Sequence, residues 1–338
     1  MGVTRAHPQY AIAIDGGGGK TDALAVDASG AVLARARAGG SSPQILGLDR
    51  ALGVVDGLVG ALIAQLGAAP VRVHCYLSGV DLPEEYAAFR AAAAAASWAP
   101  ADAEALVIEN DLFALLRAGT DEPDAAAVVC GTGINAIGVR RDGRVVRFPA
   151  LGAISGDWGG GWQLGEQALW HAARAVDGRG PETALTGAVP VALGLGSVDD
   201  VIRALHFGRL PMAALSAVAP AVFAAASDGD AVAAGLVDRQ AEEIVALAAA
   251  ALRRLDLLGA GIPVVLGGGV VAGGDERLMR GVRQRLAEHA PHARPVVVDA
   301  PPVVGAALLA AAALGAAPDA LGRLASALSP ASAAAAPV

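Results

Sequence analysis

Short apolar runs separated by glycine or polar turns dominate the first part of the chain. Residues 11–14 are apolar and lead into four consecutive glycines, and two further apolar runs follow, at 23–26 and 32–36. Short apolar runs bounded by turn residues are typical of β-strands, so this spacing predicts a three-strand meander. Beyond it, stretches with apolar residues at helical spacing alternate with further short apolar runs. The predicted elements are helices over residues 49–66, 84–96 and 112–117 and strands over residues 71–77 and 105–108.

The same meander recurs further along the chain. Apolar runs at 126–130, 135–139 and 145–148 are separated by a glycine turn and a polar turn, as in the first copy. The two copies lie about 115 residues apart, which indicates an internal duplication in which each copy founds one domain. The sequence therefore predicts an α/β protein of two related domains.

The pattern after the second meander is mostly helical. Residues 156–165 are predicted to be a glycine-rich loop, and helical spacing follows over 166–175 and through most of 182–258. The Ala-, Ser- and Pro-rich tail from residue 329 is predicted to be disordered. The other predicted elements are strands over residues 263–266 and 296–298 and helices over residues 276–288 and 303–314.

Composition narrows the possible partners. The formal net charge is −8, and no basic patch or basic amphipathic helix offers a route to nucleic acid or to a membrane surface. Although 54% of the residues are hydrophobic, the longest uncharged runs, 210–227 and 300–318, are interrupted by prolines. Neither run supplies the roughly 20 strongly apolar residues that a membrane span requires. Residues 1–8 contain no apolar signal core, so we expect a cytoplasmic protein.

The two cysteines, Cys75 and Cys130, both lie in apolar, strand-like runs. This position is typical of buried free thiols in a reducing compartment. Two thiols cannot fill a tetrahedral zinc site, and no histidine stands at ligand spacing near them. We therefore expect no structural metal.

The glycine run after the first strand is a candidate phosphate loop. It reads Asp15, four glycines, Lys20 and Thr21, and Lys20 is the only lysine of the sequence. Backbone N–H groups of glycines can approach an anion closely, although a plain hairpin turn with an exposed lysine would have the same pattern. Since a carboxylate would repel phosphates unless a divalent cation lay between them, Asp15 is interpreted as a Mg²⁺ partner.

Three glycine turns in the sequence, at residues 16–19, 131–133 and 267–269, each follow directly on a short apolar strand. In a parallel α/β sheet the carboxyl ends of such strands gather at one edge, where ligands bind. Turns from two duplicated domains could therefore surround a nucleotide.

On these motifs the chain resembles the sugar kinase, heat-shock ATPase and actin superfamily. It is most similar to the N-acetylglucosamine kinase branch, which includes the activating ATPases of benzoyl-CoA reductase. The resemblance implies two duplicated ribonuclease H-like domains of the actin-like ATPase fold with an interdomain cleft, the cofactors ATP and Mg²⁺, and a homodimer. The domains would comprise residues 1–116 with 303–338, and residues 117–302.

The resemblance also assigns roles to individual residues. Asn110 and Asp111 match a family pair whose aspartate is the catalytic base, and the loop from Gly156 to Gly159 resembles a Gly-Asp-x-Gly loop that contacts the sugar. The nucleotide-binding residues would be Asp15, Gly17, Gly18, Gly19, Lys20 and Thr21 in the first phosphate motif, Gly131, Thr132 and Gly133 in the second, and Gly267, Gly268 and Gly269 in the adenosine motif. The substrate-binding residues would be Ser42, Ser78, Asn110, Asp111, Thr132, Gly156, Asp157 and Glu166.

Three positions depart from the family pattern. Gly19 stands where a threonine is common, Ser42 stands where an asparagine is usual, and Leu151 occupies the place of a tryptophan. The first removes a hydroxyl contact to the nucleotide, and the second shortens a group that reaches the sugar. They bear on the identity of the sugar more than on the type of reaction.

Several of these residues also have structural interpretations. Asp111 could cap the helix that starts at Leu112, but Asn110 could already fill that role. An acidic acceptor such as Asp157 suits two neighbouring sugar hydroxyls, and Glu166 could support the sugar or only start the next helix.

Other side chains near these motifs also have simple structural interpretations. We expect Trp158 and Trp162 to pack into the core. Ser78 could touch the sugar, and Asp81 could cap the helix that follows it.

The sequence thus predicts a kinase that transfers phosphate from ATP to a hydroxyl of an amino sugar, either N-acetylglucosamine or glucosamine. One alternative is an activating ATPase of a dehydratase or reductase, which would hold an iron–sulfur cluster on cysteines. The other is a sugar or nucleotide sensor without catalytic activity.

Overall fold

The computed structural model describes residues 9–329 as two compact units. Unit 1 is formed by the chain up to Asp121 together with the chain from Val298 onward, and unit 2 runs from Glu122 to Val297. These limits differ by five residues from the domain boundaries expected at 116 and 303. The predictions for residues 1–8 and for the tail beyond residue 329 lie outside the described residues.

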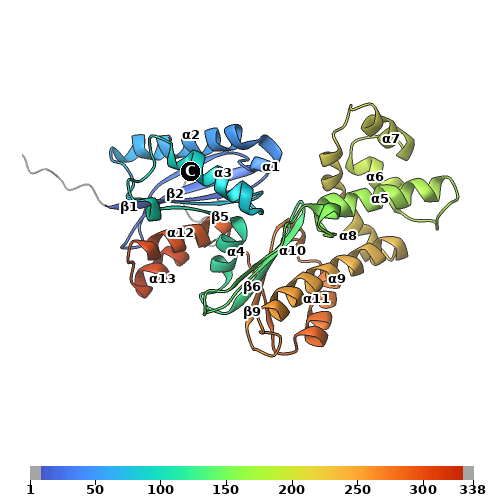
Figure 1. Cartoon of the computed structure of the whole chain (residues 1–338). Coiled ribbons are helices and arrows are strands. Elements are labelled where there is room, and N and C mark those ends of the chain that lie inside the picture. The colour runs from blue at the N-terminus through green and yellow to red at the C-terminus, as the bar shows by residue number, and fades with distance from the viewer. Residues whose placement is uncertain (1–8, 330–338) are drawn as a thin grey trace, which may run out of the picture. The chain divides into compact units, whose positions relative to one another are not determined.

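Unit 1 is built on a five-stranded mixed sheet with strand order β3-β2-β1-β4-β5 (Figure 1). Strand β1 pairs antiparallel with β2 and parallel with β4, and β4 pairs parallel with β5. The strands are β1 (Tyr10–Gly16), β2 (Lys20–Asp27), β3 (Val32–Gly39), β4 (Arg72–Leu77) and β5 (Leu106–Asn110). The helices are α1 (Pro43–Leu46), α2 (Leu48–Leu66), α3 (Pro83–Ala94), α4 (Asp111–Gly119), α12 (Pro302–Ala313) and α13 (Pro318–Ala327), with a 3₁₀ turn η1 (Ala103–Ala105).

Both faces of this sheet are covered, which explains why β1 is apolar from Tyr10 to Ile14. Ile12 and Ile14 point into one buried cluster, which α2 and α3 complete, whereas Ala11 and Ala13 point into another, formed with α12 and α13. Because side chains alternate between the faces of a strand, burial on both faces requires an uninterrupted apolar run.

Unit 2 repeats this plan with strand order β10-β9-β6-β7-β8. Its strands are β6 (Ala125–Cys130), β7 (Ile134–Val139), β8 (Val145–Arg147), β9 (Pro263–Gly267) and β10 (Arg294–Val297). Its helices are α5 (Gly160–Val176), α6 (Leu185–Ala192), α7 (Val198–His206), α8 (Ala219–Ser227), α9 (Ala231–Arg254), α10 (Gly269–Ala272) and α11 (Glu276–His289), with 3₁₀ turns η2 (Gly152–Ile154) and η3 (Met212–Val218). A single large core joins this sheet to α5, α8, α9 and α11.

The two sheets confirm the predicted duplication and the α/β fold class. In each, an antiparallel three-strand meander, β1-β2-β3 or β6-β7-β8, is extended from its first strand by two parallel strands. In each, the added strands come later in the chain, after helical connections. The cleft between the domains stays a prediction.

The features that the sequence did not predict include α13 and the first turns of α5. Helix α13 was not predicted, although it packs Leu324 into the same cluster as α12. Helix α5 begins at Gly160 rather than at Glu166, because glycines there permit close contacts that favour the helix in spite of their low intrinsic propensity.

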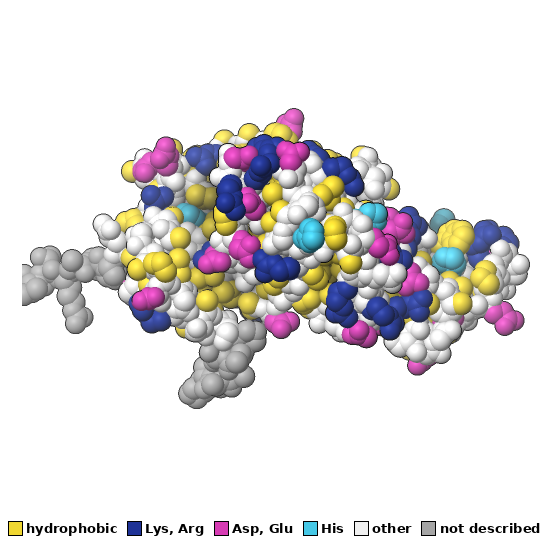
Figure 2. Space-filling view, turned by 90° about the horizontal axis from the view of Figure 1, so that it is seen from below, with side chains coloured by type: hydrophobic (Ala, Val, Ile, Leu, Met, Phe, Trp, Pro, Cys, Tyr) yellow, Lys and Arg dark blue, Asp and Glu magenta, His cyan; other side chains and the backbone are white. Residues whose placement is uncertain are grey.

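No single helix within residues 9–329 is long and apolar enough to cross a membrane. The segment Met212–Ser227 and the helix Ala231–Arg254, bent by 115° at their junction, meet the criteria of length and composition only when taken together. Acidic and basic side chains are mixed over the face shown in Figure 2.

Candidate active site

Three parallel strands of unit 1 end at the same edge of its sheet. Gly16, the last residue of β1, lies beside Leu77 of β4, and Leu77 lies beside Asn110 of β5. The residues that follow these strands therefore emerge side by side. They are the glycine turn after Gly16, Ser78 after β4, and Asp111 at the start of α4.

The first glycine turn is hydrogen-bonded to two neighbouring segments, one at Ser41 and one at Ser78. The Ser41 N–H donates to Gly17 O at 3.0 Å, and the Ser78 N–H donates to Gly16 O at 2.8 Å. A Cβ atom at Gly16 would lie 2.1 Å from Ser41 Oγ, and one at Gly40 would lie 2.2 Å from Gly18 O. Only glycine fits at Gly40, where the obstructing atom belongs to the backbone, and a Cβ at Gly16 would displace the side chains of Ser41 and Leu77. Gly19 is exposed and has open space around it.

The two residues after the glycines have different surroundings. The Lys20 side chain is 59% exposed and its Nζ lies 3.4 Å from Asp22, so it is free to move toward an anion. Thr21 is buried, and its hydroxyl lies 2.7 Å from Gly39 O and 2.8 Å from Ser41 Oγ. Here Thr21 holds the segment with Ser41 and Ser42 against the turn. Ser41 was not among the expected site residues, because nothing in its local sequence marks this contact.

Two half-buried carboxyl groups, those of Asp15 and Asp111, lie at this edge, and the charge of Asp111 acts on Asp15. Burial, assisted by the nearby Asp111 and Asp22, raises the pKa of Asp15 to about 8, while Lys20 opposes the shift. Burial also raises the pKa of Asp111 to about 6. Hydrogen bonds from the backbone N–H groups of Leu112 and of Asp111 itself act in the opposite direction and lower this pKa. A cation placed here would relieve the repulsion between the two carboxylates.

The donor set at Asp15 fits a magnesium ion bound together with a nucleotide. Within the part of the chain that the structure describes, no group of three or more His, Cys, Asp or Glu side chains could hold a metal by itself. Mg²⁺ is usually bound through one or two carboxylates, with phosphate oxygens and water completing its octahedron. Asp15 beside a glycine turn supplies that kind of arrangement.

Asn110 fixes the start of α4 and thereby the place of Asp111. The Asn110 Oδ1 accepts from the Leu112 N–H at 3.0 Å, which confirms it as the helix cap and leaves Asp111 free of that role. Its Nδ2 donates to Asp81 Oδ1 at 2.8 Å. The expectation that Asp81 caps the next helix is wrong, because Leu82 is the N-cap residue of α3; Glu85 Oε2 accepts the N–H groups of Asp81 and Leu82. Asp81 holds Asn110.

The two candidate sugar-binding serines of unit 1 lie near this edge. Ser42 is 3% exposed, and its Oγ would lie 2.5 Å from a Cβ atom at Gly79. The Ser78 Oγ is buried and has no hydrogen-bond partner within residues 9–329. A buried hydroxyl without a partner is costly, so Ser78 is suited to a ligand hydroxyl.

Unit 2 brings its two glycine turns together in the same way. The strands β6 and β9 are parallel, with Val129 beside Gly267, so the turns 131–133 and 267–269 leave the same edge. Gly268 has φ of +91°, and a Cβ atom there would lie 2.4 Å from Cys130 O. The backbones of the two turns are therefore in direct contact, as a backbone-lined ligand site requires.

The candidate sugar loop, residues 156–159, leads into α5, which is tied to the first of these turns. The Gly161 N–H donates to Gly131 O at 2.7 Å, and the Trp162 N–H donates to Thr132 O at 2.9 Å. The half-buried Asp157 carboxylate accepts a hydrogen bond from the Ser155 hydroxyl. Gly156 is exposed beside it.

Two expectations for this region need correction. Trp158 is 9% exposed and packs into the core as expected, but Trp162 is 45% exposed, so the prediction that it packs into the core is wrong. Glu166 lies within α5, on its exposed side, and does not start the helix. A contact of Glu166 with the sugar stays a prediction. Cys75 and Cys130 are fully buried free thiols, as expected.

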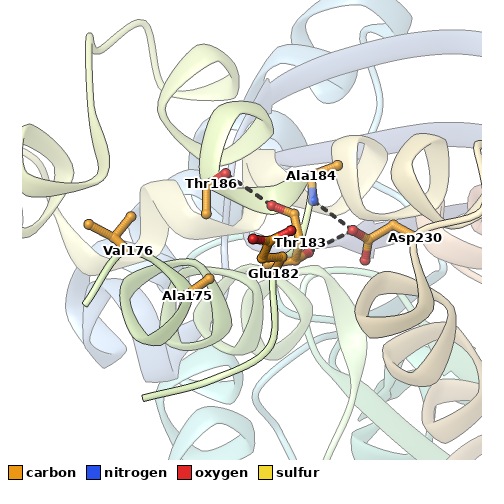
Figure 3. Close-up of a pocket in the computed structure, with 7 residues that line it drawn as sticks. All are labelled: Ala175, Val176, Glu182, Thr183, Ala184, Thr186 and Asp230. Atoms are coloured by element: carbon orange, nitrogen blue, oxygen red, sulfur yellow. Dashed lines mark hydrogen bonds between the residues drawn. The ribbon is translucent and has the colours of Figure 1, made fainter. Parts of the chain in front are cut away.

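A separate cavity of about 600 Å³ lies in unit 2 and shares none of its lining with the predicted site. Figure 3 shows that Asp230 is hydrogen-bonded to two other residues of the lining, Thr183 and Ala184. Its Oδ2 accepts from Thr183 Oγ1 at 2.9 Å and from the Ala184 N–H at 2.6 Å, and its Oδ1 caps α9. These contacts give Asp230 a structural role. The lining consists of Ala175, Val176, Glu182, Thr183, Ala184, Thr186 and Asp230.

A family model and several known proteins match most of the chain. The model of the BadF/BadG/BcrA/BcrD ATPase family matches residues 12–310. An N-acetyl-D-glucosamine kinase of Dictyostelium discoideum is 28% identical over 318 residues, which cover 88% of this chain and 97% of that protein. An N-acetylmuramic acid/N-acetylglucosamine kinase of Clostridium acetobutylicum is 26% identical over 166 residues, 49% of this chain and 54% of that protein. The crystal structure of a proposed N-acetylglucosamine kinase from Chromobacterium violaceum has a TM-score of 0.68 and 26% identity, and covers 90% of this chain and 99% of that one.

Proposed function

Because this chain belongs to the BadF/BadG/BcrA/BcrD ATPase family, we propose that it is an ATP-dependent kinase that phosphorylates a hydroxyl of an amino sugar, N-acetylglucosamine or glucosamine. Relatives that bear this activity in their names match most of the chain. The observation that carries the proposal is the edge of the unit 1 sheet, where Asp15 lies near the end of β1 and a glycine turn and Asp111 follow the parallel strands β1 and β5.

In this proposal Asp111 is the general base. Its carboxylate accepts the proton of the attacking sugar hydroxyl, and its raised pKa makes it a stronger base than an exposed aspartate. Asn110 keeps Asp111 at the first turn of α4 and leaves its carboxylate free of capping. The Asn110 amide is itself engaged with Leu112 and Asp81, so we assign it to positioning the base as well as to the substrate site.

The donor side would consist of glycine turns and one carboxylate. Asp15 would hold Mg²⁺, which neutralises phosphate charge when it is bound. The turn 16–19 with Lys20 would contact phosphate oxygens, and the turns 131–133 and 267–269 would contact the second phosphate region and the adenosine. In the proposed site, Thr21 contributes by holding Ser41 against the glycine turn.

The acceptor side would be formed by short polar groups. Ser42, Ser78 and Asp157 are proposed to bind sugar hydroxyls, together with Thr132, Gly156 and Glu166. The unpartnered Ser78 hydroxyl supports this assignment. On the resemblance alone we also propose a homodimer, and the two buried free thiols support a cytoplasmic location.

The activating ATPases of the same family are the main alternative. They would need cysteines accessible to an iron–sulfur cluster, whereas Cys75 and Cys130 are fully buried in the strands β4 and β6. Burial also raises the pKa of both thiols to about 12, which opposes the thiolate form that binds iron. These observations favour the kinase.

Replacement of the base tests the assignment. Asp111→Asn should lower kcat by roughly 10²–10⁴-fold, since the amide cannot accept the proton. This loss corresponds to about 3–5 kcal/mol of barrier. The affinity for ATP should change little, and the fold should be kept because Asn110 caps α4.

A matched control makes the same exchange at a site without a proposed role. Asp319 occupies the first turn of α13 and is exposed, so Asp319→Asn should turn over at the wild-type rate. Turnover by Asp111→Asn within twofold of wild type in a steady-state assay would remove Asp111 from the catalytic role.

A further inference from the structure

The loop that carries Asp157 is held by two glutamine side chains from different helices. Gln163, in the first turn of α5, accepts the Gly159 N–H through Oε1 and donates to Asp157 O at 3.1 Å through Nε2. Gln240, in the middle of α9, accepts the Gly160 N–H through Oε1 at 2.8 Å. Three backbone groups of a four-residue stretch are therefore fixed by side chains.

Gln240 is unusual because it is fully buried in an apolar environment. It is 0% exposed, and its neighbours along α9 include Val237, Ala241 and Ile244, which are core residues. Its Nε2 has no hydrogen-bond partner within the described residues. Burying an amide that leaves a donor unsatisfied costs free energy, so packing alone would favour leucine or methionine here.

The close fit around Gln240 explains why the loop contains glycines. Gly159 has φ of +139°, and a Cβ atom there would lie 2.7 Å from Gln240 Nε2. Gly160 has φ of +83°, and a Cβ atom there would lie 2.5 Å from the Cα of Gly133. Gln240 thus meets the loop where its backbone touches the turn 131–133.

A second contact from α9 reaches the same loop. The guanidinium of Arg239 lies 4.1 Å from the ring centroid of Trp158, in a cation–π contact. Arg239 also lies 3.8 Å from Glu243, one turn further along α9. The helix therefore supports both ends of the stretch from Trp158 to Gly160.

From these contacts we propose that Gln163 and Gln240 are positioning residues that clamp the sugar loop, so that Asp157 is held ready for the acceptor. The clamp rests on the proposed function for its role in sugar binding. Gln163 acts on the loop alone, whereas Gln240 acts at the junction of the loop and the turn 131–133. Loss of Gln163 should therefore affect the sugar only, and loss of Gln240 should affect the sugar and the nucleotide.

The test uses Gln163→Met and Gln240→Met, which keep the length of the side chain and remove its hydrogen bonds. We expect each to raise KM for the sugar about tenfold, which is about 1.4 kcal/mol for a lost hydrogen bond. Gln240→Met should also raise KM for ATP, and Gln163→Met should not. Gln284→Met makes the same exchange on the exposed face of α11 and should leave both KM values unchanged.

Gln240→Glu separates the clamp from simple core packing. A carboxyl group buried in this apolar site stays protonated. Its carbonyl oxygen still accepts the Gly160 N–H, so this variant should recover most of the sugar affinity that Gln240→Met loses. A purely structural role would instead lower thermal stability and the active fraction without changing either KM.

Hydrogen exchange provides a readout that does not need a sugar. The amides of Gly159 and Gly160 should exchange faster in Gln163→Met and Gln240→Met, respectively, while the amides of α11 keep their wild-type rates. Unchanged exchange together with unchanged KM values overturns the clamp. If the wild-type protein shows no sugar-dependent turnover, the proposed function fails, and the exchange rates alone decide whether the glutamines fix the loop.

Discussion

At the scale of single residues, the proposed function assigns the chemistry to two acidic side chains with different tasks. Asp15 lies beside the glycine turn and Asp22, where its high pKa marks a place that favours a bound cation. Asp111 lies at the start of a helix that its neighbour Asn110 caps, although the backbone N–H groups of Leu112 and of Asp111 itself also interact with its carboxylate. The cap at Asn110 supports the proposal that Asp111 is the base.

Gly19 allows a test of the donor side at the same scale. It is exposed, and a Cβ atom there would meet nothing within 4 Å, so the site accepts a larger side chain. Gly19→Thr should supply a hydroxyl to the nucleotide and lower KM for ATP about fivefold, as one added hydrogen bond of about 1 kcal/mol would do. Steady-state kinetics at saturating sugar measures this change.

Gly19→Val is the matched control, because valine has the shape of threonine without its hydroxyl. It should leave KM for ATP near the wild-type value. Equal effects of the two exchanges would show that stiffening of the turn, rather than a new contact, is responsible.

At the scale of elements, the position of the proposed base depends on the packing of α4 against α12. A Cβ atom at Gly305 of α12 would lie 1.8 Å from Ala114 O and 2.7 Å from Ala118 N of α4. Both atoms belong to the backbone, so neither can move aside without shifting the helix. This close approach holds the helix that begins with Asp111.

Gly305→Ala should therefore destabilise the protein by about 3 kcal/mol or more, since overpacking a helix contact forces the backbone to shift. Differential scanning calorimetry measures the loss as a lower Tm. The matched exchange is Gly322→Ala in α13, where a Cβ atom would meet nothing within 4 Å. That variant should gain about 0.5–1 kcal/mol from helix propensity. Equal Tm values for the two variants would contradict this description of the contact.

The strands of this protein could be predicted from the sequence, but the start of helix α5 could not. The pattern predicted the strands well, because apolar runs bounded by turns report burial on both faces of a sheet directly. It placed the start of α5 six residues late, since Gly160, Gly161 and Gly165 disfavour a helix locally. Those glycines are set by distant partners: a Cβ atom at Gly165 would lie 1.9 Å from Leu215 O, which no local pattern can reveal.

At the scale of the whole molecule, the duplication could be predicted from the sequence because it repeats a turn pattern as well as an apolar pattern. The site motifs could be found for the same reason, as Asp15, Asp111 and the three glycine turns each lie at the end of a strand or directly after it. Gln240 could not, because its contact with Gly160 joins residues 80 positions apart and leaves no mark on either segment. Such a contact is visible only once the chain has folded.

The duplicated plan also has a functional meaning. Each unit presents glycine turns at the carboxyl ends of its parallel strands, which is where ligands bind in open α/β sheets. Unit 1 adds the two carboxylates, and unit 2 adds the Asp157 loop. The proposed kinase therefore divides its chemistry between two copies of one fold.

The central claim is that ATP is consumed in order to phosphorylate an amino sugar, and its most direct test is ADP release by the wild-type protein with Mg²⁺ and ATP. The acceptors are N-acetylglucosamine, glucosamine, mannosamine, glucose, and no sugar. We predict that N-acetylglucosamine or glucosamine raises ADP release at least about tenfold over the sugar-free rate, a difference of about 1.4 kcal/mol in barrier. The same rate of ADP release with and without sugar would contradict the kinase and favour an ATPase.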